Sequence, residues 1–401
     1  MPSFKEAVSI RMLRRLLKED LGLVYTTIGG LGSSILGALF WLFLASILNV
    51  EEYGLVNFYI ALATLAAAFG ALGLNTTVMA YLPKGEESIL YEANSITLVS
   101  GLTSAIILSL FQWASSLLSA AFIFFNMTLA ELLGRKMYRK YALTSIGQRT
   151  AQISLSILLY FWFGIIGIIL GYFLGSLIFS YRYLKSTVKF TLKINTLKEK
   201  QKFTLHSYGF NLVGSLSAYL DKIIIGTIYG YYALGLYQLG YQFFMFLSII
   251  PTSLYQYLLP EESSGQSKKE IKLIGIICSI AVAVIIFMTS PCIIENFFPT
   301  FMESTPIVKV MSLAVIPSTI TAELNASLLG KGKSKKVFVA GLAYLASLIT
   351  GLTIFGRTIG ALGLAITLVT AQAIQAICLG ITLNSQLYTI NQEGKNNNMQ
   401  K

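Results

Sequence analysis

Charged residues are scarce in this chain. They make up 12% of its 401 residues, hydrophobic residues make up 55%, and the mean hydropathy is +0.69. A soluble domain carries about 25% charged residues, so the composition excludes a soluble globular protein and predicts a polytopic membrane protein. Each helical span needs about 20 apolar residues. We therefore expect an all-α protein with about 12 transmembrane helices and no large extramembrane domain.

Residues that bind metals or form disulfides are also few. The one histidine is His206, and Cys278, Cys292 and Cys378 lie in or beside apolar runs without paired spacing. This excludes a histidine-rich metal site and favours the cysteines as small core residues. The sequence has no GxGxxG motif or other phosphate-cradling loop, so we expect neither a nucleotide cofactor nor a metal.

Basic residues give the chain a net charge of +12, which raises the question of a nucleic-acid partner. Nearly all of them lie in the connections between apolar runs that would share one side of a membrane. The exceptions are Arg149, Lys222, Lys309 and Arg357. The positive-inside rule explains this bias better than nucleic-acid binding does. It predicts a multi-pass cell-membrane protein with both termini in the cytoplasm.

The chain contains an internal repeat. LLGRKMYRK at residues 132–140 matches LLGKGKSKK at residues 328–336, and at the same offset Gly164 and Gly167 match Gly360 and Gly363. The repeat predicts two six-helix lobes in the same orientation, an arrangement found in transporters. The predicted parts are an amphipathic cytoplasmic helix (1–20), an N-lobe (21–184), a basic cytoplasmic linker (185–203), a C-lobe (204–384) and a polar cytoplasmic tail (385–401).

A polar stripe runs along the predicted fifth helix. Ser145, Gln148, Arg149, Gln152 and Ser156 fall on one face at 100° per residue. An arginine at this depth cannot face lipid cheaply, so one interpretation is a hydrated cavity in which Arg149, Gln148 and Gln152 bind an anionic substrate. In the other, Arg149 reaches the headgroups and the amides join helices.

A second stripe lies on the predicted seventh helix. It contains Asn211 and Lys222, with Asp221 beside them, in a run that otherwise reads as a membrane span. We interpret Asn211 and Lys222 as substrate-binding residues. Asp221 would pair with a cation or titrate with a coupling proton or sodium ion. The alternative is a fixed salt bridge, although neighbouring helical residues do not face each other well. No residue is predicted to be catalytic.

Pro251 and Pro317 interrupt two of the apolar runs. A proline inside a helix removes a backbone hydrogen bond, so we expect the predicted eighth and tenth helices to kink there. A further uncharged stretch of 38 residues, between Glu92 and Glu131, is too long for one span and predicts two helices with a tight turn at Trp113.

Two segments resemble a known family. LDKIIIGTIYGYYALGLYQLGYQF, which contains Asp221 and Lys222, and NVEEYGLVNFYIALATLAAAFGALGLNTTVMAYLP resemble polysaccharide-biosynthesis flippases of the Wzx type. These flippases belong to the superfamily shared with MATE drug exporters and peptidoglycan-precursor flippases. The resemblance implies a cationic cavity between two lobes and transport of polyprenyl-pyrophosphate-linked oligosaccharides by alternating access. Arg149 belongs to no such motif.

The function expected is therefore a flippase rather than an enzyme. Its partners would be the lipid-linked oligosaccharide, membrane lipids, and glycosyltransferases or a polymerase of the same pathway, with no nucleic acid. A MATE-like ion-coupled exporter is the first alternative, although it would need an acidic cavity. The second is a membrane glycan polymerase or ligase, which would need a long outer loop, whereas the longest one expected is Pro291–Thr305. A membrane partner without transport activity is a third.

Overall fold

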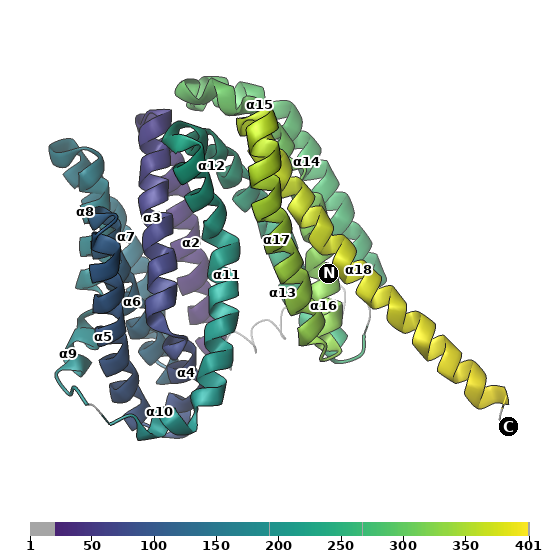
Figure 1. The fold of residues 1–401 in the computed structure, drawn as a ribbon, viewed down its shortest axis with the longest axis horizontal. Coiled ribbons are helices and arrows are strands. Elements are labelled where there is room, and N and C mark those ends of the chain that lie inside the picture. The colour runs from purple at the N-terminus through teal and green to yellow at the C-terminus, as the bar shows by residue number, and fades with distance from the viewer. Residues whose placement is uncertain (1–20, 192, 267, 400–401) are drawn as a thin grey trace, which may run out of the picture. The chain divides into compact units, whose positions relative to one another are not determined.

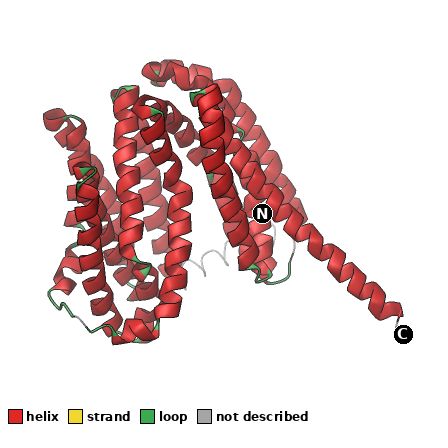
Figure 2. Cartoon of the chain, viewed as in Figure 1, coloured by secondary structure: helices red, strands yellow, loops and turns green. Residues whose placement is uncertain are grey.

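The computed structural model describes residues 21–399 apart from 192 and 267, with side chains as far as residue 383. Within that part of the chain the secondary structure is helical and no strand occurs (Figure 2). The predicted amphipathic helix at 1–20 lies outside the described residues. The all-α prediction is confirmed for the rest.

The chain divides into two units. The first comprises residues up to Trp41 together with Tyr59–Ser215, and the second comprises Leu42–Phe58 together with the chain from Leu216 onward. Three helices therefore contribute to both units: α2 (Leu21–Ile47), α3 (Val50–Ala71) and α11 (Gln201–Ile228).

The first unit is built around α6, which packs on α4, α5, α7, α8 and α9 (Figure 1). Its core contains Val78, Ile89, Ile123 and Met127, all nearly inaccessible. Besides the shared segments it comprises α4 (Leu74–Tyr81), η1 (Leu82–Lys84), α5 (Ser88–Ser109), α6 (Trp113–Gly134), α7 (Tyr138–Phe163), α8 (Ile165–Ile178), α9 (Tyr181–Thr187) and α10 (Asn195–Glu199). Because α5 ends at Ser109 and α6 begins at Trp113, the predicted division of the long uncharged stretch is confirmed.

The second unit pairs α13 with α16, α17 with α18, and α12 with α15. Its own helices are α12 (Gly230–Leu247), α13 (Ile249–Ser263), α14 (Lys269–Phe297), η2 (Pro299–Ser304), α15 (Thr305–Ser312), α16 (Val315–Gly330), α17 (Ser334–Ile359) and α18 (Ala361–Met399). Small apolar clusters join these helices, and one of them contains Leu247, Ala283 and Val315.

Both predicted proline interruptions are confirmed. Ser248 separates α12 from α13, three residues before Pro251, and α15 gives way to α16 just before Val315, close to Pro317. A proline has no N–H for the carbonyl four residues earlier, so the carbonyls of Leu247 and Leu313 lose their α-helical donor, and that of Leu313 accepts the Ile316 N–H at 3.2 Å instead. The breaks fall next to those carbonyls.

Eight helices among the described residues are long and apolar enough to cross a membrane. The count becomes nine if the bent pair α8 and α9 forms one span. The long helices α5, α7 and α11 fall outside this set, and the last two carry the two polar stripes. The protein is thus a multi-pass membrane protein, and the finer prediction of about 12 spans in two six-helix lobes stays a prediction.

The sequence repeat corresponds to repeated backbone geometry. Gly164, between α7 and α8, has φ 57° and ψ −138°, and Gly360, between α17 and α18, has φ 68° and ψ −144°. Three residues later, a Cβ on Gly167 would lie 2.1 Å from the carbonyl oxygen of Leu159, and one on Gly363 would lie 2.0 Å from that of Phe355. Only glycine accommodates both the positive φ and the close approach.

The paired basic turns also match. Lys136 and Gly332 both have positive φ, 56° and 71°. The next amide in each turn, Met137 or Lys333, donates to the carbonyl of Leu132 or Leu328. This is the Schellman arrangement that ends a helix, so the LLG segments terminate α6 and α16 in the same way.

We predict that Gly363→Ala destabilises the protein by about 1–3 kcal/mol, because the new methyl group overlaps the Phe355 carbonyl. Gly167→Ala should cost a similar amount if the two turns are equivalent. The matched control is Gly341→Ala on α17, where a Cβ meets nothing within 4 Å. Thermal unfolding in detergent measures the differences, and a tolerated Gly363→Ala would show that the turn can open.

Candidate functional site

The Arg149 cluster lies in the first unit, on α7. The Oε1 atom of Gln152 accepts two hydrogen bonds, from Gln148 Nε2 at 3.0 Å and from Arg149 Nη1 at 3.1 Å. Gln148 Nε2 also lies 3.2 Å from the hydroxyl of Ser176 on α8. Gln152 therefore contacts both of the other residues predicted from the α7 stripe, and its carbonyl oxygen orients the guanidinium.

Most of the stripe faces α8. Ser145, Gln148, Gln152 and Ser156 are buried, and Ser156 donates to the carbonyl of Ile168. The helices approach closely because α8 presents glycines at Gly167, Gly171 and Gly175; a Cβ on Gly171 would lie 2.3 Å from the Ser156 backbone nitrogen. Glycines four residues apart are typical of closely packed membrane helices, and they serve that role here. These amides and hydroxyls join α7 to α8.

Arg149 itself is only partly buried, and its guanidinium lies along α2. A Cβ on Gly37 would be 3.4 Å from its Cζ and Nε atoms, so the absence of a side chain there gives the guanidinium its space.

Several polar atoms of the cluster have no hydrogen-bond partner among the described residues. They are Arg149 Nε, Gln152 Nε2 and Ser145 Oγ. A buried donor without an acceptor costs about 1–3 kcal/mol. A positively charged group flanked by unpaired donors is suited to an acceptor-rich anion such as a phosphate.

Asn211 lies elsewhere in the first unit, on α11. Its side-chain amide donates to Thr76 Oγ1 at 3.0 Å and to Asn75 Oδ1 at 3.4 Å, which joins α11 to α4. Within the described part of the chain it makes no hydrogen bond to the Arg149 cluster. The sequence stripe thus placed Asn211 on a polar surface but did not identify its partners.

The second cluster belongs to the second unit and centres on Asp221 and Lys222. Both side chains are buried, at 2% and 5% exposure. The Lys222 ammonium lies 3.2 Å from Asp221 Oδ1 and donates to the Ala218 carbonyl at 2.7 Å. The two neighbours form an ion pair because the lysine side chain folds back along its own helix.

Tyrosines surround this pair. The Tyr237 hydroxyl donates to Asp221 Oδ2 at 2.7 Å, and the Tyr241 ring lies 3.8 Å from the Lys222 ammonium. Tyr344 of α17 is close enough to interact electrostatically with Asp221 and Tyr241. A cation over an aromatic ring is stabilised by about 0.5–2 kcal/mol. Sequence reasoning missed these tyrosines, although Tyr237 and Tyr241 stand one turn apart in the segment that carried the family resemblance.

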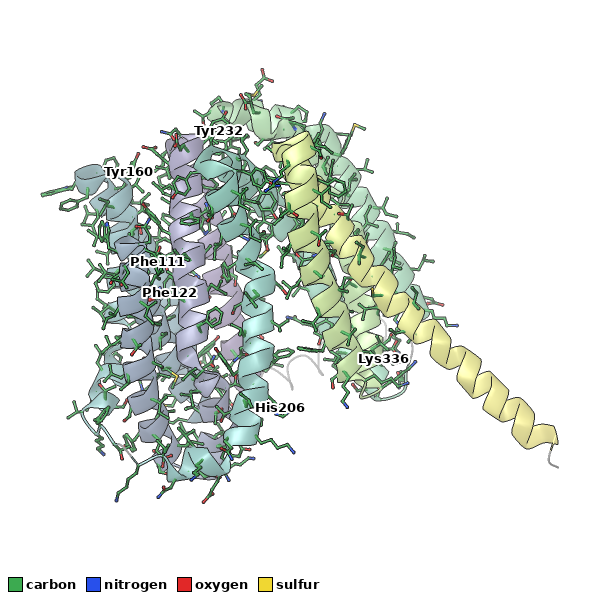
Figure 3. The ribbon with its side chains drawn as sticks, in the orientation of Figure 1. Phe111, Phe122, Tyr160, His206, Tyr232 and Lys336 are labelled. Atoms are coloured by element: carbon green, nitrogen blue, oxygen red, sulfur yellow. The ribbon has the colours of Figure 1, made fainter. Side chains whose placement is uncertain are left out.

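His206 is exposed on the part of α11 that belongs to the first unit (Figure 3). Its Nδ1 lies 2.6 Å from the Lys202 carbonyl. Among the described residues no group of three or more histidine, cysteine or acidic side chains could hold a metal ion.

Solved structures define the class of fold. The chain is similar to the lipid II flippase MurJ in an inward closed conformation, with a TM-score of 0.69, 16% identity, and coverage of 90% of this chain and 87% of that one. An inward-facing multidrug resistance MATE family transporter of the MOP superfamily gives a TM-score of 0.70 at 16% identity, covering 92% and 96%. A MOP superfamily transporter from Pyrococcus furiosus gives a TM-score of 0.58 at 14% identity, with coverage of 92% of this chain and 95% of that one. The fold is that of the MOP transporters.

The family follows from the sequence. The model of the polysaccharide biosynthesis protein family matches residues 21–260, more than half of the chain. The chain belongs to that family. No curated protein sequence matches it significantly.

Proposed function

We propose that this protein is a flippase that moves a polyprenyl-pyrophosphate-linked oligosaccharide from the cytoplasmic to the outer leaflet by alternating access. The product would serve cell-surface polysaccharide or glycoprotein assembly, with glycosyltransferases or a polymerase of the pathway as further partners. Family membership and the MOP fold support a membrane transporter of the flippase type. MurJ, whose structure is similar to this one, is a flippase of lipid II.

The observation that carries the substrate class is the Arg149 cluster. It combines a guanidinium that makes no ion pair among the described residues with unpaired donors on Arg149 and Gln152. A diphosphate offers the acceptors and the negative charge that such donors match. A cationic drug carries a charge of the wrong sign for an unpaired guanidinium, so this cluster favours the flippase over a MATE-like exporter.

We assign different roles to the residues of the two clusters. Arg149 contacts the diphosphate. Gln148 and Gln152 hold the network around Arg149 and contact the substrate head group. Asn211 binds sugar hydroxyls. Lys222 is a second cation for the substrate, and its pairing with Asp221 suggests that the pair opens when an anion or a coupling ion binds. Asp221 is the proposed ion-coupling residue, with a proton or a sodium ion as the ion.

The test is transport by the purified full chain in liposomes. A fluorescent polyprenyl-pyrophosphate oligosaccharide is followed by its accessibility to a membrane-impermeant quencher, with protein-free liposomes as the control. We expect protein-dependent movement of this lipid. Ion-driven efflux of a cationic dye without movement of the lipid would establish the exporter instead, and formation of glycan polymer would establish an enzyme.

A further inference from the structure

The connection between α8 and α11 is an ordered segment on the first unit, and its outward side forms a surface. The chain bends by 59° between α8 and α9, so α9 turns aside where the apolar α8 ends. From there, α9 and α10 lie beside the first turns of α5 (Figure 1).

Buried contacts fix this connection in place. Tyr183 is 1% exposed, stacks on Phe124 with ring centroids 4.7 Å apart, and donates to the Asn94 carbonyl. Arg182 pairs with the buried Glu131 at 2.6 Å, which ties α9 to α6.

The second half of the connection is held by α5. The buried carboxylate of Glu92 accepts the backbone N–H groups of Thr196 at 3.3 Å and Leu197 at 2.9 Å. The Ser95 hydroxyl accepts the N–H of Thr191 at 3.0 Å. A basic loop needed only to orient the chain in the membrane would not require this set of buried contacts.

The outward side carries apolar and basic side chains together. Val188, Phe190 and Ile194 are 84%, 47% and 46% exposed, and Lys185, Lys193 and Lys198 are exposed among them without an ion pair in the described part of the chain. We call these six residues the linker surface. The only acidic residue between 181 and 202 is Glu199.

We propose that the linker surface binds a bilayer of anionic phospholipids, with the lysines on the phosphate headgroups and Val188 and Phe190 inserted between them. The alternation of exposed lysines with exposed apolar side chains matches an interface that is negatively charged outside and apolar beneath. The 59° bend turns the chain aside at the end of the apolar helix α8, just before the linker surface begins. This proposal does not depend on which substrate the protein transports.

The first experiment titrates phosphatidylglycerol or phosphatidylcholine into the full chain in neutral detergent and follows thermal stabilisation. Because each lysine near an anionic surface contributes about 1 kcal/mol, Lys185→Gln/Lys193→Gln/Lys198→Gln should raise the half-maximal phosphatidylglycerol concentration at least about tenfold. The response to phosphatidylcholine should not change. The matched control, Lys269→Gln/Lys331→Gln/Lys335→Gln, removes three exposed lysines from the second unit. It should shift the half-maximal phosphatidylglycerol concentration less than about twofold. Equal shifts in both variants would overturn the proposal, since net charge alone would then explain the binding.

A second experiment tests insertion. Phe190→Trp in bilayers containing lipids brominated on the acyl chain should show more fluorescence quenching than the wild-type protein, whose Trp41, Trp113 and Trp162 supply the background. Quenching equal to background would place the linker surface in water and overturn the proposal; it would favour a protein partner there. In the first experiment, high salt should weaken the stabilisation by phosphatidylglycerol, because the Debye screening length falls to about 3 Å at 1 M ionic strength.

Discussion

Replacing Arg149 with glutamine is expected to raise the half-saturating concentration of lipid-linked oligosaccharide about 100-fold in the liposome assay. A hydrogen bond to a charged group contributes about 1.5–3 kcal/mol. A loss of about 3 kcal/mol, the upper value for one such bond or the lower value for two, corresponds to roughly that factor. Glutamine keeps a polar side chain next to Gln152 but removes the charge and the unpaired Nε donor. Arg149→Lys should be intermediate, because it restores the charge without the planar fork.

The control for this variant is Arg139→Gln, an exposed arginine in the first turn of the same helix α7. It removes the same charge, so a comparable loss of transport would point to a general electrostatic effect. Unchanged transport by Arg149→Gln, with normal folding, would show that the guanidinium only fills the space that Gly37 leaves on α2.

The α7 stripe shows what sequence can predict at such a site. Its spacing correctly placed Gln148, Arg149 and Gln152 on one face, because helical periodicity alone decides this. It could not show that the face is packed against the glycines of α8, nor that Ser176 completes the network. Those contacts depend on a partner helix, and a single sequence contains no direct signal for it.

The repeat was more informative than the stripes. Its matched positions predicted turns that have the same conformation, such as Gly164 with Gly360, because glycine at a positive φ is a backbone requirement that sequence records directly. The breaks near Pro251 and Pro317 were predicted in the same way, because a missing backbone N–H is also a property that the sequence states directly. The ion pair of Asp221 with Lys222 was left open, because its geometry depends on how one flexible side chain folds over Ala218 and Tyr241.

The Asp221–Lys222 pair provides the second large effect. Asp221→Asn leaves a buried ammonium without its counter-charge, and losing one partner of a buried ion pair costs about 3–5 kcal/mol. The variant should therefore unfold at a clearly lower temperature than the wild-type protein. Lys222→Met should also be destabilising, but Tyr237 still donates to the remaining carboxylate.

The double variant Asp221→Asn/Lys222→Met separates stability from function. Replacing a whole buried ion pair by well-packed hydrophobic residues of similar volume is often neutral or stabilising. Since the double variant leaves no uncompensated buried charge, we expect it to unfold within about 1 kcal/mol of the wild-type protein. If Asp221 couples transport to an ion, this well-folded variant will flip lipid at a rate that no longer responds to proton or sodium gradients. Transport and gradient dependence equal to those of the wild-type protein would instead assign the pair a purely structural role. The measurement is the same liposome assay with and without each gradient. Because the double variant is expected to stay folded, a loss of gradient dependence reports on coupling rather than on unfolding.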